Sequence, residues 1–116
     1  MPSLTILLAA GYPLHVPTLA QLLPLLAAQP DDAFLRYAVA MEYTKQGQLT
    51  HALAEFAELA RRHPDYVPGY FMAGRAAEQD ANPQEARRLY ELGIAAARRT
   101  GDRHAEGEIS QALGAL

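Results

Sequence analysis

The chain has 116 residues, half of them hydrophobic and 20% charged, which suits one compact domain and excludes a disordered chain or two independent catalytic domains. It has no cysteine, which excludes disulfides, thiolate metal sites and a cysteine nucleophile, and its formal charge of -3 disfavours a general nucleic-acid binder. Alanine and leucine together number 40, against 11 for valine, isoleucine and threonine. Because alanine and leucine favour helices, the composition predicts an all-α fold.

Residues 1–17 are predicted to form an apolar N-terminal tail. No lysine or arginine precedes Arg36, so a secretory signal is not expected. The apolar runs at residues 4–10 and 22–28 are shorter than the roughly 20 residues of a membrane span. We therefore expect a cytoplasmic protein without membrane contact, whose tail either covers apolar surface of the domain or mediates self-association.

The first predicted helix spans residues 18–29. Thr18 follows Pro17 and is a suitable N-cap, and a leucine stripe follows it. Pro24 lies inside the segment, where a proline can kink a helix. The stripe consists of Leu19, Leu22, Leu23 and Leu26.

An internal repeat with a period of 34 residues follows. Stepping back by the same interval from Phe56 and Leu59 reaches Leu22 and Leu25, so residues 18–29 are interpreted as the second half of an earlier, degenerate repeat. The matching pairs are Pro30 and Pro64, Asp31 and Asp65, Tyr37 and Phe71, Ala40 and Gly74, Ala52 and Ala86, Phe56 and Tyr90, and Leu59 and Gly93.

Each repeat is predicted to contain two helices. In the first, residues 33–46 and 49–62 are separated at Gly47, and Pro64 follows the second helix. In the second, the helices span residues 67–79 and 83–98. Asn82 is the N-cap of the later helix, and Pro83 lies in its first turn. Together with the flanking segments, this predicts about six helices.

Two glycines inside the predicted helices indicate close helix packing. Gly74 and Gly93 each cost a helix about 1 kcal/mol relative to alanine. A facing aromatic ring that packs against the backbone offsets this loss. We therefore expect Tyr90 or Phe56 to approach these positions.

Residues 101–116 are predicted to form a capping helix, which begins after the break at Gly101 and Asp102. A stack of helical hairpins needs such a helix, because its last hairpin otherwise exposes an apolar face. The apolar residues on one stripe of this helix are Ala105, Ile109, Ala112, Leu113 and Leu116.

The repeated unit resembles the tetratricopeptide repeat. The residues that carry the resemblance are Ala40 and Gly74, Tyr43, Ala52 and Ala86, Phe56 and Tyr90, and Pro64. Arg36 departs from the pattern, since it stands at a position that is usually large and apolar. The resemblance implies a short α-solenoid, a single domain over residues 18–116 with repeats at 33–66 and 67–98, similar to small stand-alone bacterial proteins of this family.

The resemblance also implies that the first helix of each repeat lines a concave groove for a protein or peptide. Arg75 suits a carboxylate or an aromatic ring. Tyr37, Met41 and Met72 replace the lysine and asparagine with which co-chaperone members hold a terminal carboxylate, so that use is disfavoured. The alternative is that the groove is buried by the N-terminal helix or by a second copy in a homodimer. The groove residues are Phe34, Tyr37, Met41, Thr44, Lys45, Pro68, Phe71, Arg75, Glu78 and Gln79.

Signs of catalysis are weak, and we predict a protein that is not an enzyme and has no cofactor or metal. None of the glycine-rich or serine motifs of nucleotide-binding proteins and hydrolases occurs. His51 and Glu55, four residues apart, are the one hint of a metal site, but a His-Glu-x-x-His motif is absent and the other histidines are scattered along the chain. Acidic residues interleave with the basic pairs Arg87–Arg88 and Arg98–Arg99, which disfavours nucleic acid as a partner.

Overall fold

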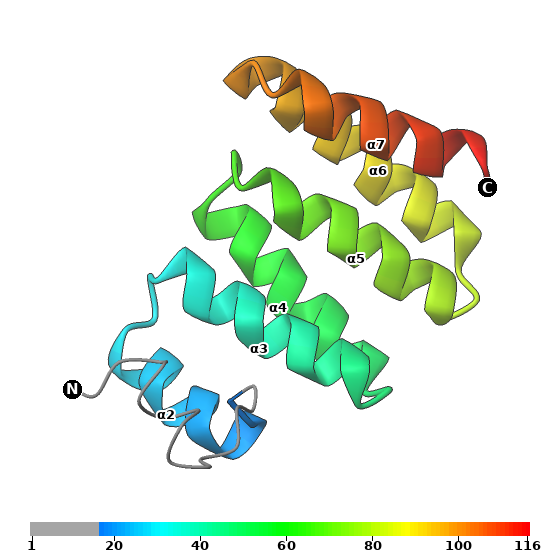
Figure 1. Ribbon diagram of the computed structural model, residues 1–116. Helices are drawn as coiled ribbons and strands as arrows, with labels where there is room; N and C mark the ends of the chain where they lie inside the picture. Colours follow the sequence, from blue (N-terminus) through cyan, green and yellow to red (C-terminus); the bar gives the residue numbers. More distant parts are fainter. Residues whose placement is uncertain (1–16) are drawn as a thin grey trace, which may run out of the picture.

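Residues 17–116 are described by a computed structural model and contain six α-helices (Figure 1). The predicted all-α class and the number of helices are confirmed for these residues. The predicted tail, apart from Pro17, lies outside the described residues. The helices are α2 (Leu19–Ala28), α3 (Ala33–Lys45), α4 (Leu49–Arg62), α5 (Val67–Gln79), α6 (Pro83–Thr100) and α7 (Arg103–Gly114).

The helices stack as consecutive hairpins, from α2 at one end to α7 at the other (Figure 1). Helix α5 contacts both α3 and α7, so these three form a continuous layer, here called the inner layer. Helix α4 contacts α3 and α5, and α6 contacts α5 and α7, but the backbones of the described α4 and α6 do not meet. Because α3, α5 and α7 are the more closely spaced set, their outward surface is the concave side of the stack.

Helices α6 and α7 both begin at a side-chain N-cap, and the one at Asn82 was predicted. The side chain of Asn82 accepts a hydrogen bond from the backbone N–H of Glu85 at 3.2 Å. Asp102 accepts from the N–H of Ala105 at 3.0 Å. Helix α6 continues two residues past its predicted end, because Gly101, at a φ of 73°, provides a left-handed C-cap there.

The turns inside the two hairpins have the same geometry. Gly47 joins α3 to α4 at a φ of 76°, and Ala81, 34 residues later, joins α5 to α6 at a φ of 56°. In each turn the N–H of the following residue donates at 2.9 Å to the carbonyl four positions before the left-handed residue. The two turns therefore repeat the same backbone conformation, although only the first has glycine at the left-handed position.

The expected close approach occurs at both helical glycines. A Cβ atom at Gly74 would lie 2.8 Å from Cζ of Tyr90 and closer still to two other ring carbons. At Gly93 the neighbour is Tyr70, whose Cβ would lie 2.9 Å away, and Phe56 is not among the nearest atoms. The expectation that Tyr90 or Phe56 approaches these glycines is thus confirmed at Gly74 by Tyr90, whereas at Gly93 the neighbours are Tyr70 and Ile109, because α6 meets α5 and α7 there.

The leucine stripe of α2 is narrower than predicted. Leu22 and Leu26 are buried, whereas Leu23 is 40% and Leu25 is 48% exposed. Leu23 was thus wrongly placed on the stripe, and Leu25 does not share the burial of Leu59, with which the repeat paired it. Among the described helices, α2 contacts only α3. Helix α3 therefore covers only leucines that lie one turn apart on the same side of α2, which are Leu22 and Leu26.

The stripe of α7 is also shorter than predicted. Ile109 is buried, and Ala105, Ala112 and Leu113 pack against the core. Leu116 lies beyond Gly114, the last residue of the helix, and is exposed. Its place on the stripe was therefore wrong, because the helix ends before the chain reaches it.

Candidate functional site

The concave face is formed by side chains of α3 and α5 that point away from the core. Phe34 is 68% exposed, the highest value among the large hydrophobic residues described. Lys45, Pro68, Arg75, Glu78 and Gln79 are also exposed. The other four predicted groove residues, Tyr37, Met41, Thr44 and Phe71, are half-buried. The predicted residues are therefore not equally available to a ligand.

Tyr37 belongs partly to the core. Its ring centroid lies 6.4 Å from that of Phe56 and 5.6 Å from that of Tyr66. Burial, with a smaller contribution from Tyr66, raises the pKa of the Tyr37 phenol. Tyr37 thus forms a wall of the concave face, and Phe34 is the aromatic side chain that projects from it.

Phe71 and Arg75 form the predicted pair on α5. The guanidinium carbon of Arg75 lies 5.8 Å from the centroid of the Phe71 ring, within the range of a cation–π contact. Phe71 in turn lies 6.1 Å from the buried ring of Tyr90, which holds it in place. Arg75 makes no ion pair with any residue in the range 17–116, so its N–H groups are available for a carboxylate.

Two other predicted groove residues are engaged within the chain. Glu78 accepts a hydrogen bond from the hydroxyl of Tyr90, and burial together with this carboxylate raises the pKa of the Tyr90 phenol. Thr44 donates to the carbonyl of Ala40 at 2.9 Å. Both residues still line a shallow hollow of about 410 Å³, together with Met72, Arg75 and Gln79.

A second hollow, of about 210 Å³, lies between α5 and α7 and is here called the α5–α7 pocket. Five of its eight lining residues come from α7 or the turn before it, whose residues were predicted only to cap the stack. The repeat itself carries the missing signal, because a step of 34 residues from Phe71 and Arg75 reaches Ala105 and Ile109. The lining residues are Val67, Pro68, Phe71, Asp102, His104, Ala105, Glu108 and Ile109.

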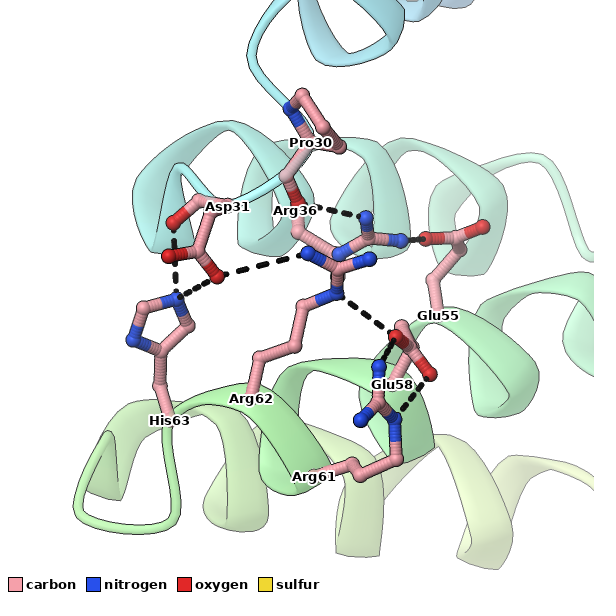
Figure 2. Close-up of polar contacts among 8 residues, drawn as sticks. All are labelled: Pro30, Asp31, Arg36, Glu55, Glu58, Arg61, Arg62 and His63. Atoms are coloured by element: carbon pink, nitrogen blue, oxygen red, sulfur yellow. Dashed lines mark hydrogen bonds and ion pairs between the residues drawn. The ribbon is translucent and has the colours of Figure 1, made fainter.

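Arg36, the departure from the repeat pattern, is 8% exposed and lies in a polar cluster between α3 and α4 (Figure 2). Its guanidinium donates to Glu55 at 2.6 Å and to the carbonyl of Pro30 at 2.8 Å. At the equivalent place in the second hairpin, the hydroxyl of Tyr70 donates to the carbonyl of Pro64, also at 2.8 Å. Arg36 therefore replaces an aromatic residue while satisfying the same backbone group.

The rest of the polar cluster ties the end of α4 to the turn before α3 (Figure 2). Glu58 accepts hydrogen bonds from Arg61 at 3.0 Å and Arg62 at 2.7 Å, and these bonds lower the pKa of its carboxyl to about 2. Arg62 also lies 3.5 Å from the carboxylate of Asp31, and His63 Nε2 lies 2.9 Å from the carbonyl of Asp31. The side chains of Arg61, Arg62 and His63 thus already contact acceptors within the chain.

The suggested pairing of His51 and Glu55 around a metal does not form. Glu55 is in the ion pair with Arg36, and the His51 ring stacks on Tyr43 with centroids 5.1 Å apart. Residues 17–116 contain no group of three or more side chains arranged to hold a metal ion. In the same part of the chain, no helix is long and apolar enough to cross a membrane.

Three arginines of the remaining basic pairs also face carboxylates of the chain. A ligand phosphate would have to compete with these ion pairs. The pairs are Arg88 with Glu85, Arg98 with Glu106, and Arg99 with Asp65.

Comparison with known proteins gives a consistent picture, although no family model matches the chain. TPR repeat-containing protein PA0015 of Pseudomonas aeruginosa is 29% identical over 86 residues, which cover 74% of this chain and 82% of that protein. Protein BPP2914 of Bordetella parapertussis has the same fold, with a TM-score of 0.73 at 24% identity over 85% of this chain and 86% of that one.

Two structures of a tetratricopeptide repeat domain protein from Salinibacter ruber are more similar in sequence. The solution structure is 37% identical with a TM-score of 0.68, covering 72% of this chain and 85% of that one. The crystal structure is 36% identical with a TM-score of 0.65, covering 71% and 91%. Domains of this kind are generally protein–protein interaction modules and typically not enzymes. On this evidence the chain belongs to the tetratricopeptide repeat family and is homologous to small bacterial proteins of that family.

Proposed function

We propose that the concave face of α3 and α5 binds an extended or helical segment of another protein. The observation that carries this proposal is Phe34, a large aromatic side chain with 68% of its surface exposed beside half-buried Tyr37 and Met41. Burying such a ring is a major source of binding energy in protein interfaces. Membership of a family that generally binds proteins supports the same function.

Arg75 gives the proposed face a polar anchor. Its guanidinium rests on Phe71, which limits the entropy lost when it binds a ligand, and it has no ion pair in residues 17–116. A carboxylate of the bound segment can therefore form a charge-assisted hydrogen bond with it. The ligand that fits has an apolar or aromatic residue for Phe34 and an acidic group for Arg75.

The test is affinity capture with mass spectrometry, comparing the wild-type chain with Phe34→Ala and Arg75→Ala. Both side chains are exposed, so these changes leave the core intact, unlike changes at Tyr37 or Phe71. A matched control is Leu92→Ala, an exposed apolar residue on α6 outside the concave face.

We expect the control to retain partners that both concave-face variants lose, with circular dichroism showing unchanged helix content in all three. Equal capture by the wild-type chain and the Phe34→Ala variant would contradict the proposal.

Self-association is a second candidate function, and a different surface favours it. Helix α2 carries no charged residue, and Leu23 and Leu25 are exposed on it. Two copies that pack these leucines together would remove them from water. Light scattering across a wide concentration range tests this. We expect a dimer that Leu23→Glu dissociates and Leu92→Glu does not, whereas a monomer at all concentrations would exclude it.

A further inference from the structure

The α5–α7 pocket has an apolar floor of a size that fits one side chain. Val67 and Ile109 are buried at its base, and half-buried Phe71 forms one wall. Its volume is about 210 Å³, and an apolar cavity of about 150 Å³ is known to bind benzene in another protein. One aliphatic or aromatic side chain of a ligand can therefore enter it.

The rim of the pocket is acidic. Asp102 and Glu108 contribute two carboxylates, and neither lysine nor arginine is among the lining residues. Asp102 caps α7 and so faces the partial positive charge of that helix's N-terminus, which offsets part of its own charge. Glu108 lies six residues further along the chain, and its half-exposed carboxylate contacts His104, one helical turn before it. Unlike Asp102, Glu108 does not face a helix N-terminus, and a cation outside the pocket would share its carboxylate with His104.

The pocket shares Phe71 with the proposed binding face, where Arg75 stands over the same ring. Arg75 therefore lies over one side of Phe71, with Glu78 in the same hollow, whereas only carboxylates and His104 bring polar charge to the α7 side. A bound segment with complementary charge has a basic residue on the α7 side of its apolar anchor.

We infer that the α5–α7 pocket takes an apolar side chain of the partner protein whose neighbouring residue is lysine or arginine, held by Glu108. This inference rests on the proposed function, and it adds α7 to the binding surface. It also distinguishes the partner's chemistry, because an acidic neighbour at this position would be repelled by Glu108 and Asp102.

The test is an NMR titration of the isotope-labelled full chain with two blocked dipeptides, acetyl-Leu-Arg-amide and acetyl-Leu-Glu-amide. The measured signals are the backbone amides of Ala105, Ile109 and their neighbours. We expect the arginine peptide to bind about two- to fivefold more tightly at low salt, the range for an exposed ion pair.

Three variants separate the apolar and the charged contributions. Glu108→Gln should remove the preference for the arginine peptide, while Glu91→Gln, the same change at an exposed residue of α6, should keep it. Ala105→Leu fills the pocket and should weaken both peptides at least fivefold. Circular dichroism checks that each variant is folded.

Equal affinity for the two peptides would overturn the inference, and so would an absence of shifts at the pocket amides. Shifts of the same amides on dilution without peptide would indicate a second copy as the occupant and would also overturn it. Failure of the proposed function is distinguishable, because it is measured by partner capture with the Phe34 and Arg75 variants. Those side chains lie outside the pocket lining.

Discussion

The α3–α4 and α5–α6 hairpins share a backbone design but fill it with different chemistry. In the first, Arg36 and Glu55 form an ion pair, and in the second the residues 34 positions later are Tyr70 and Leu89. Both Arg36 and Tyr70 donate to the carbonyl of a proline six residues earlier. The comparison teaches that the repeat preserves this hydrogen bond, while the polarity of the surrounding side chains is free to vary.

The difference carries an energetic cost for the first hairpin. Arg36 is buried, and its Nε–H has no hydrogen-bond partner in the described part of the chain. An unsatisfied buried donor is unfavourable, and a buried ion pair often contributes no more than an apolar pair of the same size. The second hairpin, with Tyr70 and Leu89 buried at these places, avoids this cost.

The largest expected effect concerns the aromatic core residue that each hairpin contains. Phe56→Ala should lower the free energy of unfolding by about 3 to 5 kcal/mol, because it leaves a cavity where a buried ring was. Tyr90→Ala, the matched change in the second hairpin, should cost a similar amount. Denaturant titration measures both, and a loss below about 1 kcal/mol for Phe56→Ala would show that this ring is not core.

The ion pair of the first hairpin should show strong coupling between its two members. Glu55→Leu alone leaves a buried cation and should cost about 3 kcal/mol, the low end for such pairs because Glu55 is partly exposed. The double change Arg36→Tyr with Glu55→Leu, which copies Tyr70 and Leu89 and keeps a donor for the carbonyl of Pro30, should restore wild-type stability or exceed it. A double variant no more stable than Glu55→Leu would show that the pair stabilises the first hairpin.

The close contact at Gly74 is a further difference between the two hairpins. Gly74→Ala should cost about 2 kcal/mol despite alanine's better helix propensity, since the new methyl group meets the fully buried ring of Tyr90. The reciprocal change in the first hairpin, Ala40→Gly, should cost about 1 to 2 kcal/mol, from helix propensity and from the loss of a buried methyl group. A Gly74→Ala variant as stable as the wild type in thermal unfolding would contradict the close packing against Tyr90.

The smallest effect is expected at the left-handed turns. Ala81→Gly should stabilise the chain by about 1 kcal/mol, because glycine adopts the positive φ of 56° without a steric cost. Gly47→Ala in the first hairpin should destabilise it by about the same amount. If both changes alter the melting temperature in the same direction, the two turns are not equivalent.

Much of the fold follows from local signals in the sequence. Gly47, Pro64 and the Asn82–Pro83 pair mark helix ends, and α4 and α5 have the predicted bounds. The end of α6 was predicted at Arg98, two residues early. The helix continues to Thr100, because it ends only where Gly101 adopts a left-handed backbone conformation.

Features that depend on distant partners were not predictable. The burial of Arg36 requires Glu55, 19 residues away on another helix. The α5–α7 pocket likewise combines Phe71 with residues more than 30 positions later. Of the groove, the sequence predicted which residues share a face, but the half-burial of Tyr37 depends on Tyr66, which precedes the next helix.

The spacing of the two layers also affects mechanics. Because the backbones of α4 and α6 meet only through α5, a rotation about the long axis of α5 changes their separation without breaking a hydrogen bond inside either hairpin. The angle between hairpins can therefore change without disrupting either hairpin, and it sets the curvature presented to a ligand. A rigid ligand and a flexible ligand would accordingly bind the same chain at different curvatures.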